Sequence, residues 1–187
     1  MVDALEWTAI FVAIAVGSVV YFFLGSFLFG AGYEPTGQAR VAAMLELAEV
    51  GPTDTVYEFG AGTGAIAMRA AEKRGARVVA IEIDPLRAGI LALRRARSPA
   101  RRRITVRCGN LFRTDLTGAT VVTAFLWPSA MKRLSPQLER ELAPGSRVVS
   151  HYHPLIGWIP DAVDREHRIY LYRIPARSAG PAPAQSG

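Results

Sequence analysis

The chain contains one cysteine, two lysines and three histidines among its 187 residues. A single cysteine, Cys108, cannot form an intramolecular disulfide, which excludes the class of small disulfide-stabilised secreted domains. Lysine is scarce but positive charge is not, because 20 arginines bring the formal net charge to +6. A charge of this size favours partners such as anionic lipid, nucleic acid or an acidic protein surface, and it does not determine the fold.

Charged residues are absent from Trp7 to Tyr33. As a helix, residues 7–30 would span roughly 36 Å, which exceeds a hydrocarbon core of ~30 Å. The segment is apolar on all sides, unlike a soluble amphipathic helix. We therefore expect residues 1–33 to form an N-terminal transmembrane anchor that contacts the membrane through residues 7–30.

A cleaved signal peptide and a buried N-terminal core helix are the alternatives to an anchor. A signal peptide would begin with basic residues and have a shorter apolar run, whereas this chain begins with Asp3 and Glu6. Every basic residue follows the apolar segment, and the first is Arg40. The positive-inside rule then predicts a single-pass membrane protein whose remaining domain lies on the cytoplasmic side.

Residues 34–175 alternate short apolar strands with helices, which predicts one α/β domain with a mostly parallel sheet. We expect strands at 54–59, 77–83, 103–107, 118–127, 146–150 and 165–174, and helices at 38–50, 64–74, 85–97 and 129–142. The last strand alternates polar and apolar residues, which is typical of an antiparallel edge, and its partner is expected within 151–160. Residues 176–187 are rich in Pro, Gly, Ser and Ala and predict a flexible tail.

The first strand leads into a glycine-rich loop of sequence EFGAGTG at 58–64, which opens a helix. Glycines there let a ligand approach the backbone and the positive end of the helix dipole. Glu82 ends the second strand, where a carboxylate can accept both hydroxyls of a ribose. Glu58 before the loop would repel a pyrophosphate but suits an ammonium or sulfonium group, both of which S-adenosylmethionine carries. The alternative is a plain turn with Glu82 as a solvated charge.

The loop, Glu82 and the segment CGNLF at 108–112 together resemble the seven-strand S-adenosylmethionine-dependent methyltransferases. The resemblance implies a Rossmann-like, mostly parallel seven-strand sheet with an antiparallel edge, and S-adenosyl-L-methionine as the cofactor. It also implies the cofactor-binding residues, which are Glu58, Gly60, Gly62, Gly64, Glu82, Asn110 and Leu111. The family usually has Asp at the position of Asn110, although an amide can still hydrogen-bond the adenine.

A narrower resemblance is carried by YEPT at 33–36, IEIDP at 81–85, ATVVTAFLWP at 119–128 and PGSRVVSHYHPLIGWIP at 144–160. These segments look like the FAM173-type protein lysine methyltransferases, which include membrane-anchored mitochondrial enzymes and prokaryotic relatives. The resemblance implies a protein lysine as substrate, in some cases on a membrane protein, and places Thr36 in a segment that covers the cofactor. The family's first motif usually reads D-L-G-x-G-D-G, so Thr63 departs from it.

The methyl acceptor is expected beside Phe125-Leu126-Trp127-Pro128, at the end of the fourth strand. Enzymes that methylate nucleobase amines or glutamine amides usually carry D/N-P-P-Y/F there, so its absence argues against those acceptors. We expect Trp127 and Tyr33 to be the catalytic residues that wall a lysine channel, with Tyr152 as a further candidate. The alternative for Trp127 is a packing role.

Residues 94–113 contain eight arginines and no acidic residue. The cluster predicts contact with anionic lipid head groups or an acidic protein surface, and the alternative is an ordinary solvated surface. Nucleic acid is not expected, because the arginines are not interleaved with a series of aromatic side chains for base stacking. A metal is not expected either, because His151 and His153 share a strand face without a third ligand nearby.

The working hypothesis is a membrane-anchored methyltransferase that transfers a methyl group from S-adenosylmethionine to a protein lysine. One alternative is an enzyme of the same fold that acts on a lipid or small-molecule amine. The other is a non-catalytic, membrane-tethered, nucleoside-binding module, for which Thr63 and Asn110 are the supporting departures.

Overall fold

The computed structural model describes residues 3–28 and 37–176, without the side chains of residues 4 and 21–28. Its α-helices are α1 (Ala4–Leu28), α2 (Gln38–Leu47), α3 (Ala65–Arg74), α4 (Pro85–Arg97) and α5 (Pro128–Glu141). Its strands are β1 (Thr55–Phe59), β2 (Arg77–Glu82), β3 (Ile104–Cys108), β4 (Val121–Ala124), β5 (Arg147–His151), β6 (Ala162–Asp164) and β7 (Ile169–Arg173). Two short 3₁₀ turns, η1 (Arg101–Arg103) and η2 (Leu111–Arg113), flank β3.

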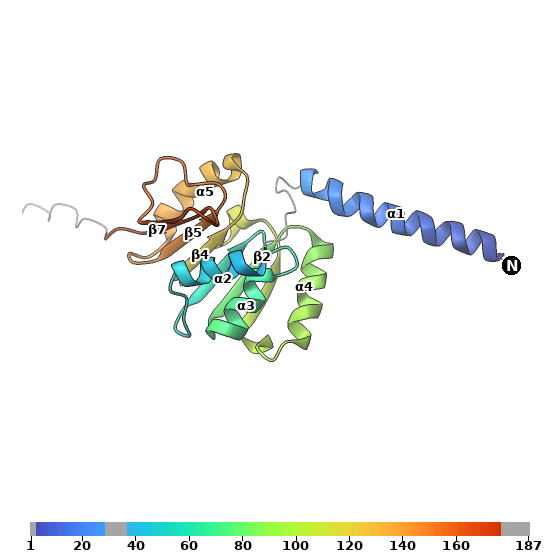
Figure 1. The fold of residues 1–187 in the computed structure, drawn as a ribbon, viewed down its shortest axis with the longest axis horizontal. Coiled ribbons are helices and arrows are strands. Elements are labelled where there is room, and N and C mark those ends of the chain that lie inside the picture. The colour runs from blue at the N-terminus through green and yellow to red at the C-terminus, as the bar shows by residue number, and fades with distance from the viewer. Residues whose placement is uncertain (1–2, 29–36, 177–187) are drawn as a thin grey trace, which may run out of the picture.

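The strands form one seven-stranded sheet in the order β3-β2-β1-β4-β5-β7-β6. The pairs among β1 to β5 are parallel, and β7 runs antiparallel to both β5 and β6. This arrangement confirms the predicted Rossmann-like sheet with an antiparallel edge (Figure 1). In this register Phe59 pairs with Ile81 and Ala124, and Glu82 pairs with Cys108, so the carboxyl ends of four strands meet at one edge.

Several predicted boundaries were wrong. The last strand begins at Ile169 and not at 165, and the helix predicted at 38–50 ends at Leu47. The fourth strand ends at Ala124 and not at Trp127, because Pro128 is the first residue of α5 and a proline is favoured at that position. The partner of the last strand is β6 at Ala162–Asp164, outside the predicted range 151–160. The segment between β5 and β6 is instead a loop, and Leu155 N–H anchors it by donating to the buried Tyr172 hydroxyl at 2.9 Å.

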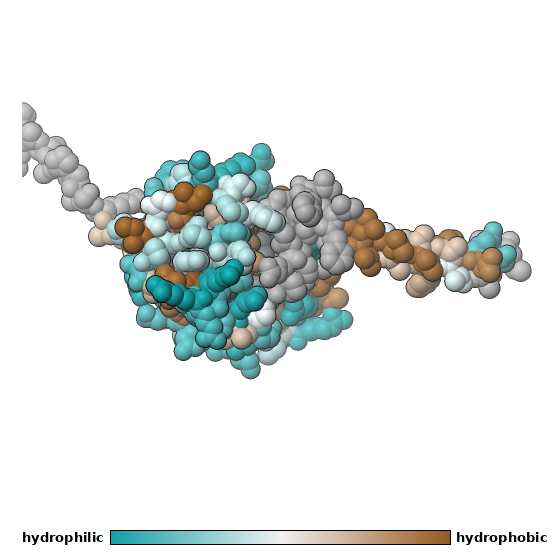
Figure 2. All heavy atoms as spheres, turned by 45° about the horizontal axis from the view of Figure 1, so that its top comes forward, coloured by the Kyte–Doolittle hydropathy of each residue, from teal (hydrophilic) through white to brown (hydrophobic). Residues whose placement is uncertain are grey.

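Helix α1 is apolar, and its described side chains from Leu5 to Val20 are exposed. Figure 1 shows α1 extending away from the domain, and Figure 2 shows its surface mostly in the hydrophobic colour beside a largely hydrophilic face of the domain. Within residues 3–28 and 37–176, no helix reaches the combination of length and hydropathy required of a membrane span. The predicted transmembrane helix is therefore not confirmed.

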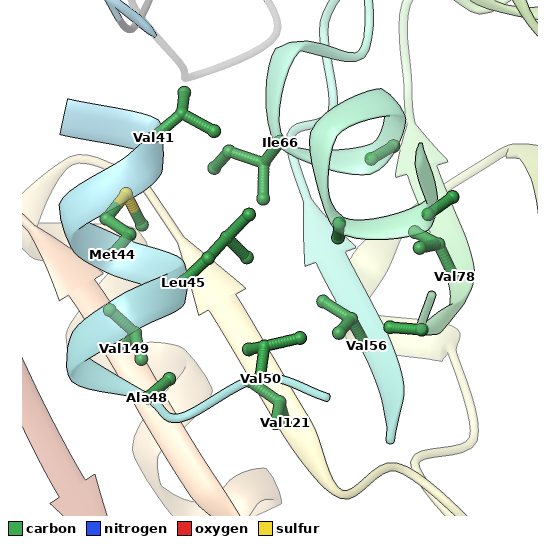
Figure 3. Packing of buried hydrophobic residues seen from close by; sticks show 14 of the residues in the cluster. Val41, Met44, Leu45, Ala48, Val50, Val56, Ile66, Val78, Val121 and Val149 are labelled. Carbon is green, nitrogen blue, oxygen red and sulfur yellow. The ribbon is translucent and has the colours of Figure 1, made fainter. Parts of the chain in front are cut away.

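Apolar side chains fill both faces of the sheet. On one face α2 and α3 pack Val41, Leu45 and Ile66 against strand residues such as Val56 (Figure 3). Leu91 of α4 belongs to this same cluster. On the other face α5 contributes Met131, Leu134 and Leu138, together with Phe59 and Tyr172 from the sheet. These two layers cover the sheet on both sides, and the residues that follow the parallel strands lie at its carboxyl edge.

Gly64, the residue before α3, packs closely against α4, and a substitution there tests how tightly the loop is packed. Its φ is +85°, and a Cβ there would lie 2.1 Å from Cδ1 of the buried Leu91. We predict that Gly64→Ala lowers the free energy of unfolding by about 2–5 kcal/mol, because left-handed strain and overpacking add. Gly118→Ala is the matched control, since its φ is +86° with open space around it, and it should cost only about 1–2 kcal/mol. Equal losses for the two variants in denaturant unfolding would contradict this packing.

Candidate active site

The loop from Gly60 to Gly64 folds back against the end of β2. The backbone N–H groups of Gly60 and Ala61 both donate to the carbonyl of Ile81, each at 3.0 Å. Gly60, Gly62 and Gly64 all have positive φ, at 69°, 55° and 85°. The loop therefore presents bare backbone at the N-terminus of α3, where a ligand can approach closely.

The Glu82 carboxylate joins this loop to the second strand. One of its oxygens accepts from Gly62 N–H at 2.6 Å and the other accepts from Asp84 N–H at 2.9 Å. Each carboxylate oxygen has a second lone pair, so Glu82 can also accept from the two hydroxyls of a ribose. The structure thus brings Glu82 and the glycine loop together, as predicted, and leaves the Glu82 carboxylate oxygens able to accept from the hydroxyls of a ribose.

Glu58 lies on β1 and is buried. Its carboxyl accepts from Ala67 N–H at 2.8 Å, in the first turn of α3. Burial raises the pKa of Glu58 from 4.5 to about 8, against the lowering effect of that hydrogen bond. The Glu82 charge adds to the rise and Arg94 opposes it. A positively charged ligand beside Glu58 would favour its ionised form, so the group suits a cationic cofactor better than an anionic one.

Asn110 and Leu111 follow β3 at the same edge of the sheet. Gly109 N–H donates to the carbonyl of Glu82 at 2.8 Å, which fixes this segment beside the second strand. The Asn110 side-chain oxygen accepts from Phe112 N–H at 3.0 Å and caps η2. Its amide N–H groups can donate to ring nitrogens of an adenine. The predicted adenine segment therefore lies next to Glu82.

Trp127 stands between β4 and α5 and is half exposed. Its ring stacks on His153, with ring centres 6.3 Å apart and 24° between the planes. Tyr152 contacts the same His153 edge-on at 4.9 Å. Leu126, next to Trp127, lies beside Gly60, because a Cβ on Gly60 would be 3.4 Å from Leu126 Cδ2. Trp127, His153 and Tyr152 thus form an aromatic row. Its first member, Trp127, directly follows Leu126, which packs on the glycine loop.

Tyr152 has an unusual backbone that the sequence did not predict. Its φ is +69°, a left-handed conformation that is costly for a bulky side chain. The backbone of Arg168 is also left-handed, and its carbonyl accepts from Tyr152 N–H at 2.8 Å. The Arg168 guanidinium lies over the Tyr152 ring, 4.8 Å from the ring centre. The surrounding structure therefore holds the half-exposed Tyr152 ring beside His153.

Arg94 hydrogen-bonds the glycine loop, although the sequence suggested only a surface role for this residue. Its Nη1 donates to the carbonyl of Thr63 at 2.5 Å. Thr63 stands where related methyltransferases usually have an acidic residue. In this chain the guanidinium of Arg94 contacts the backbone of the loop at that position. Nothing in the local sequence pattern distinguishes Arg94 from the neighbouring arginines, so only the fold reveals this contact.

Tyr33 and Thr36 lie outside the described residues. Their predicted roles, in the lysine channel and over the cofactor, stay predictions.

Comparison with known proteins identifies the family. Residues 58–162 match the ANTKMT methyltransferase domain, and this match covers the glycine loop, Glu82, Asn110, Trp127 and Tyr152. The chain belongs to this methyltransferase family. It is an S-adenosylmethionine-dependent methyltransferase.

Three relatives show how far the similarity extends. A "Protein-lysine N-methyltransferase" from Saccharolobus islandicus is 38% identical over 149 residues, which is 76% of this chain and 92% of the relative. The "Adenine nucleotide translocase lysine N-methyltransferase" of Mus musculus is 29% identical over 83% of this chain and 67% of its own length. The crystal structure of an "RNA methyltransferase" from Salinibacter ruber, bound to S-adenosyl-L-homocysteine, is 41% identical. It superposes with a TM-score of 0.74 over 77% of this chain and 95% of that one.

Glu82→Ala should weaken S-adenosylmethionine binding by at least about tenfold, because a charge-assisted hydrogen bond contributes roughly 1.5–3 kcal/mol. Calorimetry on the folded variant measures this directly. Ser98→Ala is a suitable control, because Ser98 hydrogen-bonds Glu72 at the far end of α4 and should leave the affinity unchanged. An unaltered affinity in Glu82→Ala would remove Glu82 from the binding site.

The raised pKa of Glu58 predicts a pH-dependent stability of the ligand-free enzyme. The folded state holds the Glu58 proton up to about pH 8 whereas the unfolded state releases it near 4.5, so stability falls as pH rises through this window. The loss is at most about 1.4 kcal/mol per pH unit. Glu58→Gln keeps an acceptor for Ala67 N–H but cannot ionise, so its stability relative to wild type should increase from about pH 6 to about pH 9. Denaturant unfolding measures the difference, and a pH-independent difference would contradict the assignment.

Proposed function

We propose that this methyltransferase transfers a methyl group from S-adenosylmethionine to the side-chain amine of a protein lysine. The observation that carries the proposal is the aromatic row Trp127–His153–Tyr152, which follows the carboxyl ends of β4 and β5. Leu126, the residue before Trp127, lies beside Gly60 of the glycine loop. Flat aromatic faces suit the stem and the charged head of a lysine. Two relatives named as lysine N-methyltransferases support the same substrate class.

Methyl transfer from a sulfonium is an in-line displacement, so the enzyme acts mainly by alignment and exclusion of water. The attacking amine must first lose its proton, because only the neutral form has a free electron pair. An apolar wall favours that neutral form by withholding solvent from the ammonium. Trp127 and its neighbours can supply such a wall, and no dedicated acid–base pair is required.

RNA is the second candidate substrate. The relative from Salinibacter ruber is titled an RNA methyltransferase, and the arginine-rich residues 94–113 of this chain could contact phosphate. Against RNA, the segment at 125–128 reads FLWP in place of the D/N-P-P-Y/F of enzymes that methylate nucleobase amines. Protein lysine is therefore the favoured acceptor.

Labelled cofactor separates these candidates. The full chain is incubated with S-adenosylmethionine carrying a labelled methyl group, together with membrane and cytosolic extracts that contain protein, RNA and lipid. We expect label in protein, recovered as methyllysine after hydrolysis, and none in the Glu82→Ala control. Label that is removed by nuclease, or that is extracted with lipid, would contradict a lysine substrate.

The proposal includes attachment to a membrane through residues 7–30, with the catalytic domain on the cytoplasmic side. The absence of charge from Trp7 to Tyr33 and the exposed apolar side chains of α1 support it, because water does not favour such a surface. The excess of arginine after this segment supports the orientation. The full chain should float with lipid vesicles in a density gradient, and recovery at the bottom of the gradient would contradict attachment.

Trp127→Ala should lower turnover by about tenfold to a hundredfold, because a misaligned acceptor reacts slowly. Cofactor affinity should stay within about threefold, since Glu82, Asn110 and the glycine loop are untouched. Trp127→Phe keeps an aromatic face against His153 and serves as the matched control, with most of the activity retained. Steady-state kinetics and calorimetry give the two readouts. Normal turnover in Trp127→Ala would confine this residue to packing.

A further inference from the structure

Helix α4 has an apolar outer face. Its exposed residues from Pro85 to Leu93 are all apolar, and they are Pro85, Leu86, Gly89, Ala92 and Leu93. Leu86 is 46% exposed and Leu93 is 55% exposed, while Ile90 between them is partly exposed. Leu86, Ile90 and Leu93 follow helical spacing and so form one stripe.

The other helices of the domain do not share this feature. The exposed residues of α3 are Glu72 and Lys73, and α5 exposes Lys132, Arg133, Glu139 and Arg140 together with its first two residues and Pro136. These are the polar outer faces expected of helices that cover a sheet in water. The inner face of α4 packs normally, with Ala88 and Leu91 buried. Two leucines directed outward are therefore not explained by the core.

Positive charge surrounds the end of this stripe. Arg97 continues it at the next helical position, and η1 exposes Arg101 and Arg102 immediately afterwards. Asp84, buried before α4, and Asp115 are consecutive acids in the sequence, so residues 85–114 carry none. An apolar stripe bordered by arginines is the pattern of a helix that lies in the interface of an anionic bilayer.

We propose that α4 docks the catalytic domain on the surface of an anionic lipid bilayer, with Leu86, Ile90 and Leu93 in contact with the lipid. Arg97, Arg101 and Arg102 reach the head groups. A second copy of the chain fits this face less well, because a symmetric contact would bring two arginine-rich, acid-free surfaces together. Helix α1 does not cover it in this structure, since both the stripe and the described side chains of α1 are exposed.

The position of α1 in the sequence favours the same partner. Residues 29–37 connect α1 to α2 and can span at most about 35 Å. A domain tethered to a membrane over such a distance stays close to the lipid surface, so even weak docking by α4 becomes effective. Because α4 begins three residues after Glu82, docking would also hold the cofactor edge of the sheet near the bilayer. This inference rests on the membrane attachment proposed above and adds a second contact to it.

A single labelled cysteine tests the docking in the full chain. Cys108→Ser removes the one native thiol, and Leu93→Cys then carries a polarity-sensitive fluorophore on the stripe. Glu139→Cys in the same background places the label on the exposed face of α5, which packs on the opposite side of the sheet. Both proteins are mixed with vesicles of phosphatidylcholine, with and without phosphatidylglycerol, that contain lipid spin-labelled at the head group.

With phosphatidylglycerol present, we expect the emission of the fluorophore at position 93 to shift to the blue. Its fluorescence should also be quenched at least about twofold more than that of the fluorophore at position 139. Replacing Arg97 and Arg102 with Gln should reduce the difference between the two vesicle types. Equal quenching at 93 and 139 in protein that floats with the vesicles would overturn docking while leaving attachment by α1 intact. Failure to float would overturn both. A blue-shifted emission at position 93 that is already present without lipid would also overturn docking on the bilayer. If that shift grows with protein concentration, a second copy of the chain covers the stripe. If it does not, another part of the same chain covers it.

Discussion

The hydrogen bond from Gly62 to Glu82 is the contact around which the site is organised. It joins the loop after β1 to the end of β2, and the other Glu82 oxygen holds Asp84 at the start of α4. The Glu82 backbone carbonyl in turn accepts from Gly109, which fixes the segment after β3. One residue therefore ties together the ends of three strands. A nucleoside placed there meets donors and acceptors that are already oriented, which reduces the ordering cost of binding.

The proposed acceptor residues are linked to this arrangement by hydrophobic packing. Leu126 packs beside Gly60, so the short connection from β4 to α5 cannot move without disturbing the glycine loop. Trp127 follows directly, and its stack on His153 joins this connection to the loop after β5. The cofactor-binding residues and the proposed acceptor residues thus follow adjacent strands, and an in-line methyl transfer requires the two reacting groups to be held close together.

Much of this could be predicted from the sequence because the signals are local. The periodicity of short apolar runs predicted a mostly parallel sheet, and the family resemblance carried by the loop motif, Glu82 and the segment after β3 implied the cofactor-binding residues. Trp127 and Tyr152 were named as acceptor candidates, but their link through His153 could not be predicted, because it joins residues that follow two different strands. The left-handed backbone of Tyr152 could not be predicted either, because it depends on Arg168 from a third segment. Arg94 is a similar case, since its contact with Thr63 arises only when α4 packs beside the loop. The fourth strand was predicted to extend to Trp127 because the apolar run continues to Pro128. That proline is the first residue of α5, and the strand ends earlier, at Ala124.

We propose that this site methylates lysine on protein. Quantitative mass spectrometry of lysine methylation tests it most directly, in cells that make either the wild-type chain or the Glu82→Ala variant at equal levels. We expect one or a few peptides, enriched in the membrane fraction, whose lysine methylation requires the wild-type enzyme. Identical lysine methylation in the two strains, with a cofactor-dependent change in RNA or lipid instead, would contradict it.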